Sequence, residues 1–240
     1  MKVSVNPEIK PLGDSALTVF FEDIIDRETN QLVNNFFQYL SHLKAPFIFD
    51  LIPAYRSLTI RYDTLQVLTG IESSIGAFDF MRQWAAERLK EAPDVLNENR
   101  RKLKIPVCYA TSFGTDLSKM AQSYRIEIDE IISLHTATQY HVYMIGFLPG
   151  FPYMGTVPER LRFPRKATPE AVTAGSVGIA GMQTGIYPVH SPGGWQIIGK
   201  TPMKIFDKKN PEPVFFHPGD EVSFYSITED EFKNYQGGYS

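Results

Sequence analysis

Cysteine is almost absent from this chain: Cys108 is the single cysteine among 240 residues. One cysteine cannot form an intrachain disulfide, and it excludes a metal site built from several thiolates. Cys108 stands in the middle of an apolar segment that alternates like a strand, so we expect a buried and unreactive thiol there.

The sequence also lacks an excess of charge of either sign. It has 24 Lys and Arg against 27 Asp and Glu, a net charge of −3, so neither nucleic acid nor a membrane is expected as a partner. The start of the chain has no apolar core of a secretory signal. Apolar stretches are broken by proline and glycine and fall far short of the ~20 residues that span a bilayer. A cytoplasmic protein is the default expectation.

The composition is that of a globular protein, with 43% hydrophobic and 21% charged residues. Such values exclude a disordered chain, a collagen or a coiled coil as a description of the whole sequence. A length of 240 residues suits one large domain or two modest ones.

Glycine is unevenly distributed, which suggests two domains. Ten of the 17 glycines lie between Gly146 and Gly199, so the second half is rich in tight turns, whereas the first half carries long periodic segments. The polar stretch at residues 92–103 reads as the boundary. We predict a small α+β domain over residues 1–95, a β-barrel domain over residues 103–228 and a tail over residues 229–240.

The first half alternates strands and helices. β-Branched and aromatic residues predict strands at residues 16–21, 47–52 and 57–62. Apolar residues at helical spacing predict helices over residues 25–43 and from Ile71 to Leu89. No nucleophile with an adjacent base stands out in this half, and Arg56 is interpreted as a solvated or paired surface charge.

The second half predicts many short strands, typical of a barrel or sandwich. We expect strands at residues 102–109, 177–180, 195–198, 204–206 and 222–225. Two short helices, over residues 116–124 and 129–138, are each opened by an aspartate, Asp116 and Asp129, that can cap free N–H groups. A barrel that closes its own edges, with these two helices inserted, is the expected architecture.

Residues 194–201 (GWQIIGKT) have the spacing of a phosphate-binding P-loop, GxxxxGKT. A P-loop runs from a strand into a helix, whose N-terminus carries part of the phosphate binding. Here Pro202 follows directly, no helical pattern comes after it, and the interior letters WQII suggest a strand. We therefore interpret this segment as a strand and a turn.

Other catalytic signatures are weak. The five histidines form no metal-binding spacing, so no metal is predicted, and His135 and His141 are interpreted as capping or core residues. Residues 174–178 have the wrong spacing for a nucleophile elbow. No residue is assigned as a general base.

A dense group of polar and aromatic residues between rigid glycines and prolines is the best candidate for a binding site. Rigid turns lower the entropy cost of holding polar groups in place for a ligand. The expected substrate-binding residues are Arg165, Gln183, Tyr187, Ser191 and Gln196. The expected pocket or partner wall consists of Phe147, Phe151, Tyr153 and Trp195. The alternative interpretation is that glycine and proline only shape the barrel corners and that Trp195 fills the core.

Seven segments resemble the KipI family, whose members are also called the B subunit of 5-oxoprolinase, or allophanate hydrolase subunit 1. They are residues 13–17 (GDSAL), 55–58 (YRSL), 105–109 (IPVCY), 146–153 (GFLPGFPY), 174–181 (AGSVGIAG), 183–188 (QTGIYP) and 191–195 (SPGGW). The likeness runs from about residue 8 to residue 226. It implies a small α+β domain followed by a cyclophilin-like β-barrel.

The resemblance also implies an activity. Family members act with subunits A and C in an ATP-dependent hydrolase that opens 5-oxoproline (pyroglutamate) to L-glutamate, the lactam being activated by phosphorylation. ATP is thus a substrate of the complex. In that scheme Arg165 would hold an anion, Gln183 and Gln196 would orient the amide, and Tyr187 or Ser191 would donate hydrogen bonds. We expect the chain to be inactive alone, because it carries too few catalytic groups.

Two departures from the family pattern stand out. Glu170 occupies a position where an arginine is expected, so Arg165 or Lys166 would have to compensate, and Lys200 stands where relatives commonly carry arginine.

Two alternative functions remain open. One is a KipI-type inhibitor that binds a sporulation histidine kinase and blocks its autophosphorylation. The other is a small-molecule binding module that acts alone.

Overall fold

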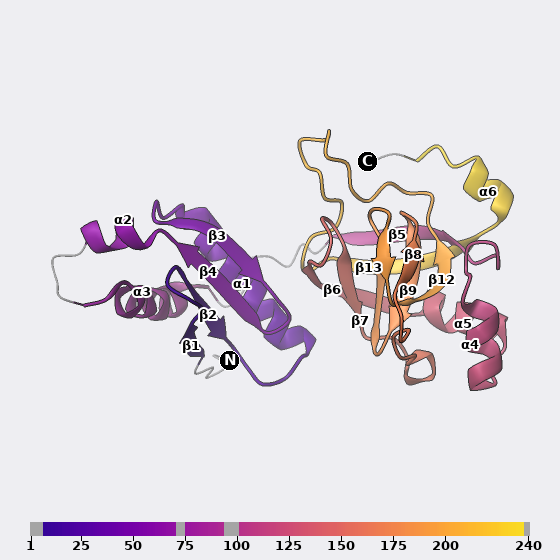
Figure 1. Cartoon of the computed structure of the whole chain (residues 1–240), viewed down its shortest axis with the longest axis horizontal. Helices are drawn as coiled ribbons and strands as arrows, with labels where there is room; N and C mark the ends of the chain where they lie inside the picture. The colour runs from indigo at the N-terminus through magenta and orange to yellow at the C-terminus, as the bar shows by residue number, and fades with distance from the viewer. Residues whose placement is uncertain (1–6, 71–74, 94–100, 238–240) are drawn as a thin grey trace. The chain divides into compact units, whose positions relative to one another are not determined.

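The computed structural model describes residues 7–70, 75–93 and 101–237. The chain divides into two compact units, Met1–Asn99 and Arg100–Ser240 (Figure 1). The predicted Ile71 and most of the predicted boundary segment lie outside the described residues. The domain limits of 1–95 and 103–228 stay a prediction.

The first unit has a four-stranded antiparallel sheet in the order β1-β2-β4-β3. Its elements are β1 (Glu8–Pro11), β2 (Ala16–Phe20), α1 (Arg27–Leu43), β3 (Ile48–Pro53), β4 (Ser57–Tyr62), α2 (Thr64–Thr69) and α3 (Ala77–Glu91). Helix α1 starts two residues later than expected, because Asp26 caps it: the Asp26 side chain accepts from the Thr29 N–H at 2.7 Å. Helix α2 was not expected from the sequence.

Strand alternation builds the core of the first unit. Leu17 and Val19 of β2 are fully buried in a cluster that also holds residues of α1 and α3. Thr18, between them, points to the other face of the sheet. Its hydroxyl forms a hydrogen bond with the Thr59 hydroxyl at 2.9 Å. The two helices therefore cover the apolar face of the sheet (Figure 1).

The second unit is built on a closed barrel, as expected, with the strand order β10-β7-β6-β13-β5-β12-β9. Its elements are β5 (Lys102–Cys108), α4 (Leu117–Tyr124), α5 (Ile128–Ala137), β6 (Gln139–Ile145), β7 (Pro152–Gly155), η1 (Glu159–Leu161), β8 (Glu170–Val172), β9 (Ser176–Ala180), β10 (Gln183–Ile186), β11 (Ser191–Gly193), β12 (Gln196–Lys200), β13 (Glu221–Ile227) and α6 (Glu229–Lys233). Strands β8 and β11 form a separate two-stranded sheet.

Parallel pairing of β5 with β13 closes the barrel across more than a hundred residues of sequence. Side chains such as Val107, Ile179 and Phe224 fill the barrel interior. Cys108 is 1% exposed, so its predicted burial is confirmed. Among the described helices, none is long and apolar enough to cross a membrane.

His135 of α5 is a core residue, as expected. It is fully buried, its ring nitrogens lie 2.7 Å from the Tyr109 hydroxyl and 3.0 Å from the Thr184 hydroxyl, and its ring stacks on Phe224. Burial lowers the pKa of His135 to about 3, so the ring is neutral at pH 7.

The predicted strand at residues 204–206 is wrong. Only Phe206 makes an isolated bridge, to Val214, within an irregular connection from β12 to β13. Ile205 is 1% exposed and anchors this connection in the core. The apolar residues of this segment therefore reflect burial of a loop and not strand pairing.

The predicted caps of the two short helices are also wrong. Asp116 precedes α4 with helical backbone angles, and its carboxylate makes no bond to the helix start. Helix α5 begins after Glu127, and Asp129 lies within its first turn. A side-chain cap requires extended backbone at the capping residue, a condition that Asp116 does not meet.

Candidate functional site

An aromatic cluster lies on the outer face of the barrel wall. Val177 and Ile179 of β9 point into the barrel core, whereas Ala180 belongs to a second apolar cluster. The buried members of that cluster, called the outer cluster below, are Phe151, Val172, Ala180, Tyr187, Trp195 and Ile197, with Leu148 and Tyr153 packed against it.

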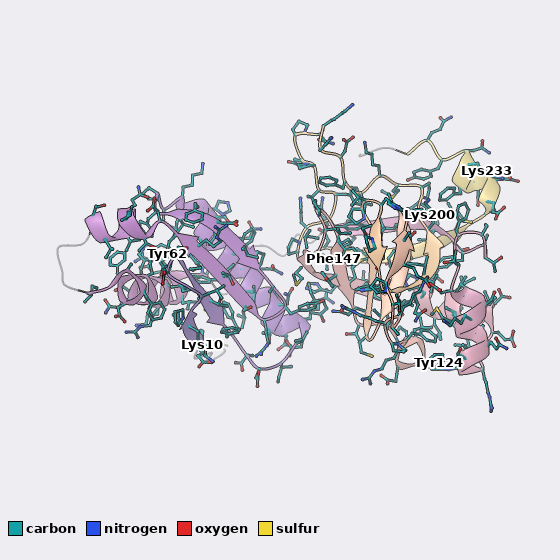
Figure 2. All side chains as sticks on the ribbon, viewed as in Figure 1. Lys10, Tyr62, Tyr124, Phe147, Lys200 and Lys233 are labelled. Atoms are coloured by element: carbon teal, nitrogen blue, oxygen red, sulfur yellow. The ribbon has the colours of Figure 1, made fainter. Side chains whose placement is uncertain are left out.

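Phe151 is the centre of the outer cluster. Its ring meets those of Tyr153, Tyr187 and Trp195 at centroid distances of 5.0, 5.2 and 5.2 Å, all in edge-to-face arrangements. Phe147 reaches the edge of the group at 5.7 Å but is 64% exposed and lies at the periphery of the barrel unit (Figure 2). All four predicted wall residues are therefore brought together: Phe151 and Trp195 are buried, Tyr153 is partly buried and Phe147 lies at the rim.

Three glycines make room for these rings. A Cβ on Gly185 would lie 2.9 Å from the Phe151 ring. One on Gly178 would lie 3.1 Å from Trp195 Cβ, and one on Gly193 only 2.4 Å from the Tyr187 hydroxyl. The glycines thus allow aromatic side chains to lie directly on the strands. This role differs from the alternative interpretation, in which glycine only shapes the barrel corners.

Three polar side chains of the predicted site have an atom left unsatisfied. Tyr187 belongs to the outer cluster and Ser191 is the cross-strand partner of Val172 in it, whereas Gln196 pairs with Ile179 of the barrel core and so lies on the other face. The Tyr187 hydroxyl, the Ser191 hydroxyl and the Gln196 Oε1 are buried and have no hydrogen-bond partner within the described part of the chain. The Trp195 backbone N–H lies near the Tyr187 hydroxyl without meeting hydrogen-bond geometry. Buried polar atoms are normally paired, so the Tyr187 and Ser191 hydroxyls at the outer cluster are groups that a ligand can complete.

The Gln196 amide is held in one orientation. Its Nε2 donates to the Pro164 carbonyl at 3.0 Å, which leaves Oε1 as the group available to accept a hydrogen bond. Gln183, at the start of β10, is half-buried and is the cross-strand neighbour of Ala180, a member of the outer cluster, on the adjacent strand β9.

Positive charge borders the outer cluster. Arg165 is exposed. Burial raises the pKa of both Tyr153 and Tyr187, and the Arg165 charge opposes that rise at each. Lys166 also opposes it at Tyr187.

Lys166 forms an ion cluster that the sequence did not indicate. Its ammonium lies 2.7 Å from an Asp116 carboxylate oxygen and 2.6 Å from a Glu170 carboxylate oxygen. Burial lowers the pKa of Lys166, but these two carboxylates outweigh it and the pKa is raised. Spacing alone could not reveal Asp116 as a partner, because it lies 50 residues before Lys166, with α4, α5, β6, β7 and η1 between the two.

The P-loop-like segment is a strand, as interpreted. Residues Gln196–Lys200 form β12, and Lys200 (labelled in Figure 2) donates to the Thr173 hydroxyl at 3.1 Å. Thr201, the last letter of the motif, is 2% exposed. The backbone therefore lacks the loop that wraps around phosphate and the helix that follows it.

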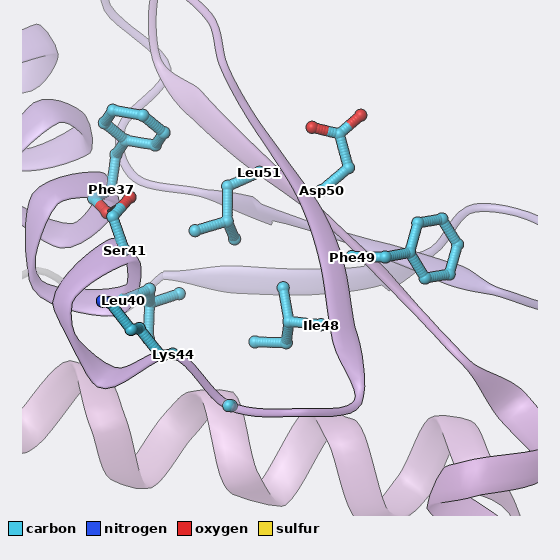
Figure 3. Close-up of a pocket in the computed structure, with 9 residues that line it drawn as sticks. Phe37, Leu40, Ser41, Lys44, Ile48, Phe49, Asp50 and Leu51 are labelled. Atoms are coloured by element: carbon cyan, nitrogen blue, oxygen red, sulfur yellow. Dashed lines mark hydrogen bonds between the residues drawn. The ribbon is translucent and has the colours of Figure 1, made fainter.

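The first unit has a shallow apolar groove of about 410 Å³ between α1 and β3. Ile48 and Leu51 point toward α1, whereas Phe49 lies on the other side of the strand (Figure 3). Lys44 and Asp50 are the charged residues that line it. It holds no group of buried polar atoms like that of the outer cluster. Across the described residues, no group of three or more His, Cys, Asp or Glu could hold a metal ion.

Comparison with known proteins defines the class. Residues 7–216 match the family described as carboxyltransferase domain, subdomain C and D. The match covers most of the chain, so the chain belongs to this family.

Two relatives carry a more particular name. The chain is 39% identical to a protein of Bacillus subtilis named as the B subunit of 5-oxoprolinase, over 98% of both chains. It is 42% identical to a Haemophilus influenzae protein of the same name, over 70% of this chain and 82% of that one. The resemblance stated from the motifs is confirmed.

A solved structure extends the comparison. The crystal structure of TTHA0988 superposes with a TM-score of 0.75 at 32% identity, over 88% of this chain. This chain spans only 40% of that protein, so TTHA0988 joins a part like this chain to a longer remainder.

Proposed function

We propose that this chain is the B subunit of an ATP-dependent 5-oxoprolinase, which hydrolyses 5-oxoproline to L-glutamate in complex with subunits A and C. The observation that carries the proposal is the match over 98% of both chains with a relative named as the B subunit of 5-oxoprolinase. The names of the relatives do not favour the alternative, an inhibitor of a histidine kinase.

The chemistry of the outer cluster supports a lactam as ligand. 5-Oxoproline has an amide N–H that donates, a lactam carbonyl that accepts and a carboxylate. The unpartnered Tyr187 and Ser191 hydroxyls can donate to the lactam carbonyl. The exposed Arg165 would draw the negatively charged ligand toward the site, and Gln183 would help to orient the amide. Donors aimed at a carbonyl oxygen also stabilise negative charge that develops there during attack.

The proposal includes partners. We infer that ATP is used by the complex, because the one P-loop-like segment of this chain is a strand. The length of TTHA0988, of which this chain spans 40%, supports a site that needs residues beyond this chain. Phe147, 64% exposed at the rim of the outer cluster, is suited to contact a partner there, since exposed aromatic residues often anchor interfaces. The cyclophilin-like assignment of the barrel belongs to the same proposal.

Reconstitution tests the proposal directly. Purified subunits A, B and C are mixed with 5-oxoproline and ATP, and glutamate is followed. We expect glutamate only when this chain is present, neither ATP nor 5-oxoproline hydrolysis by this chain alone, and a stable complex of this chain with the C subunit. An unchanged rate when this chain is omitted would refute the assignment, and ATP hydrolysis by the isolated chain would refute the shared site.

A pair of substitutions locates the site. Trp195→Ala should lower activity, but Trp195 is 5% exposed, so a melting curve must accompany the assay. Tyr187→Phe is the sharper variant, because it removes only a hydroxyl that has no hydrogen-bond partner in the described structure. We expect Tyr187→Phe to keep its melting temperature and to lose about tenfold or more in kcat/KM. Full activity in Tyr187→Phe would remove Tyr187 from the proposed site.

A further inference from the structure

The two carboxylates bound to Lys166 differ sharply in burial. The Asp116 side chain is 11% exposed and that of Glu170 is 66% exposed, while the Lys166 side chain itself is 8% exposed. One partner of the buried ammonium is therefore part of the protein interior, and the other faces solvent.

Asp116 is fixed in place by the backbone. Its carboxylate accepts from the Ile197 N–H at 2.6 Å, and its own N–H donates to the Ile197 carbonyl at 3.0 Å. This reciprocal pair ties the start of α4 to β12 and holds the carboxylate against Lys166. The Asp116 carboxylate cannot move away from Lys166 without breaking the contact between α4 and β12.

Glu170 is held far more loosely. It is the first residue of the three-residue strand β8, and Lys166 is the one hydrogen-bond partner of its side chain among the described residues. A side chain this exposed can rotate into solvent at little cost, because water replaces its hydrogen bond. The carboxylate of Glu170 can therefore be replaced by another carboxylate, while the Lys166 ammonium stays in place beside Asp116.

The Lys166 ammonium lies beside the outer cluster, because the Asp116 carboxylate oxygen that binds it also accepts from the N–H of Ile197, a member of that cluster. The Lys166 backbone N–H donates to the Gly194 carbonyl at 2.7 Å, next to Trp195, and Gly193 is the cross-strand partner of Glu170. With Glu170 turned away, Lys166 would present a free donor and Asp116 would balance its charge. An arriving carboxylate would then find a cation that is already positioned.

We propose that Lys166 binds the carboxylate of a small ligand and that Glu170 is an internal competitor which occupies the same position in the ligand-free chain. The proposal rests on the proposed function for the identity of the ligand, 5-oxoproline, but not for its chemical class, a carboxylate. Glu170 then sets the ligand concentration at which the site fills, and Asp116 positions the cation.

Acetate is a probe of this site that does not depend on the enzymatic reaction. The full chain is labelled with ¹³C at lysine Cε, and the Lys166 signal is identified by its loss in Lys166→Gln. Sodium acetate is titrated against sodium chloride at constant ionic strength. We expect Glu170→Gln to respond at an acetate concentration about threefold lower than wild type, because the competing charge is gone.

Glu159→Gln is the matched control. Glu159 is also an exposed glutamate paired with a basic residue, Arg162, at 71% side-chain exposure, and its replacement should leave the titration unchanged. An equal or higher acetate midpoint in Glu170→Gln, or a Lys166 signal that acetate moves in neither protein, would overturn the proposal.

The reconstituted enzyme gives a second readout. Glu170→Gln should lower KM for 5-oxoproline about threefold with kcat unchanged, and Lys166→Gln should raise KM in either background. An unchanged KM in an active Glu170→Gln complex would overturn the role of Glu170 and leave the proposed function intact. Absence of turnover in wild type would refute the proposed function, and the acetate titration would still decide the role of Lys166.

Discussion

Single residues of this protein show how burial changes chemistry. His135 carries a side chain that normally titrates near neutral pH, yet its pKa is lowered to about 3 by complete burial. Its two ring nitrogens are occupied by hydroxyl groups of Tyr109 and Thr184. Such a histidine stabilises the fold only while it is neutral.

The pH dependence of stability follows from this shift. The unfolded chain takes up a proton at His135 below about pH 6.5 and the folded chain does not, so stability is complete above pH 6.5 and falls as the pH drops toward 3. The loss should be about 1.4 kcal/mol per pH unit in that window. Urea unfolding followed by tryptophan fluorescence at pH 7.0 and 5.0 measures it.

The non-titrating variant His135→Asn provides the comparison for that experiment. It should be less stable at both pH values but should lose about 2 kcal/mol less than wild type between them. The exposed pairs of Glu170, Asp207 and Glu231 have lowered pKa values, so they contribute at more acidic pH. Equal losses in wild type and His135→Asn would contradict the assignment.

In the barrel unit, single contacts between distant segments join one element to another. Asp116 links α4 to β12 and to Lys166, where its sequence position had indicated a cap. The glycines of β9, β10 and β11 leave space for the rings of the outer cluster. Both features can be tested by paired substitutions.

Asp116→Asn should destabilise the protein by about 2 kcal/mol, because Lys166 would keep only an exposed carboxylate to balance its charge. Asp129→Asn is the matched control: Asp129 is exposed in the first turn of α5, and its loss should cost less than about 1 kcal/mol. Chemical denaturation measures both. A cost for Asp129→Asn equal to that of Asp116→Asn would indicate that Asp116 acts only through its helix.

Adjacent glycines provide a second test. Gly193→Ala should lower stability by about 1–3 kcal/mol, because the new Cβ would overlap the Tyr187 ring. Gly194→Ala should be tolerated, since its nearest neighbour is a carbonyl oxygen 3.7 Å away. The melting temperatures of the two variants test this prediction. Equal values would show that the Tyr187 ring can move to make room for the new Cβ.

The whole molecule contains separate cores. The core of the first unit and the two apolar clusters of the second share no residue, and the chain divides at Asn99 and Arg100. Units with their own cores can fold alone. Fragments 1–99 and 100–240 should each unfold cooperatively, which near-ultraviolet circular dichroism during heating can follow. A fragment without tertiary signal would contradict this prediction.

The local sequence pattern determined many of the strands and helices of this protein. Alternation in β2 and β4, the spacing of α1 and the proline after Thr201 are properties of neighbouring residues, so the strands, the helix and the rejection of a P-loop could be predicted. The four aromatic residues of the outer cluster, Phe151, Tyr153, Tyr187 and Trp195, were also singled out by their density between glycines and prolines. Only the tertiary structure decided where the barrel closes, through pairing of β5 with β13.

The same distinction explains the errors. Ile205 and Phe206 look like a strand because burial selects apolar residues in loops as well as in ladders. Asp116 was predicted to be a helix cap because no local sequence signal indicates its distant partners, Ile197 and Lys166. The sequence by itself determined which residue types were available for a binding site. Contacts between segments far apart along the chain decided that the Asp116 carboxylate is fixed and that of Glu170 is replaceable. They also decided which polar atoms remain without a hydrogen-bond partner, because burial and pairing depend on residues that only folding brings together.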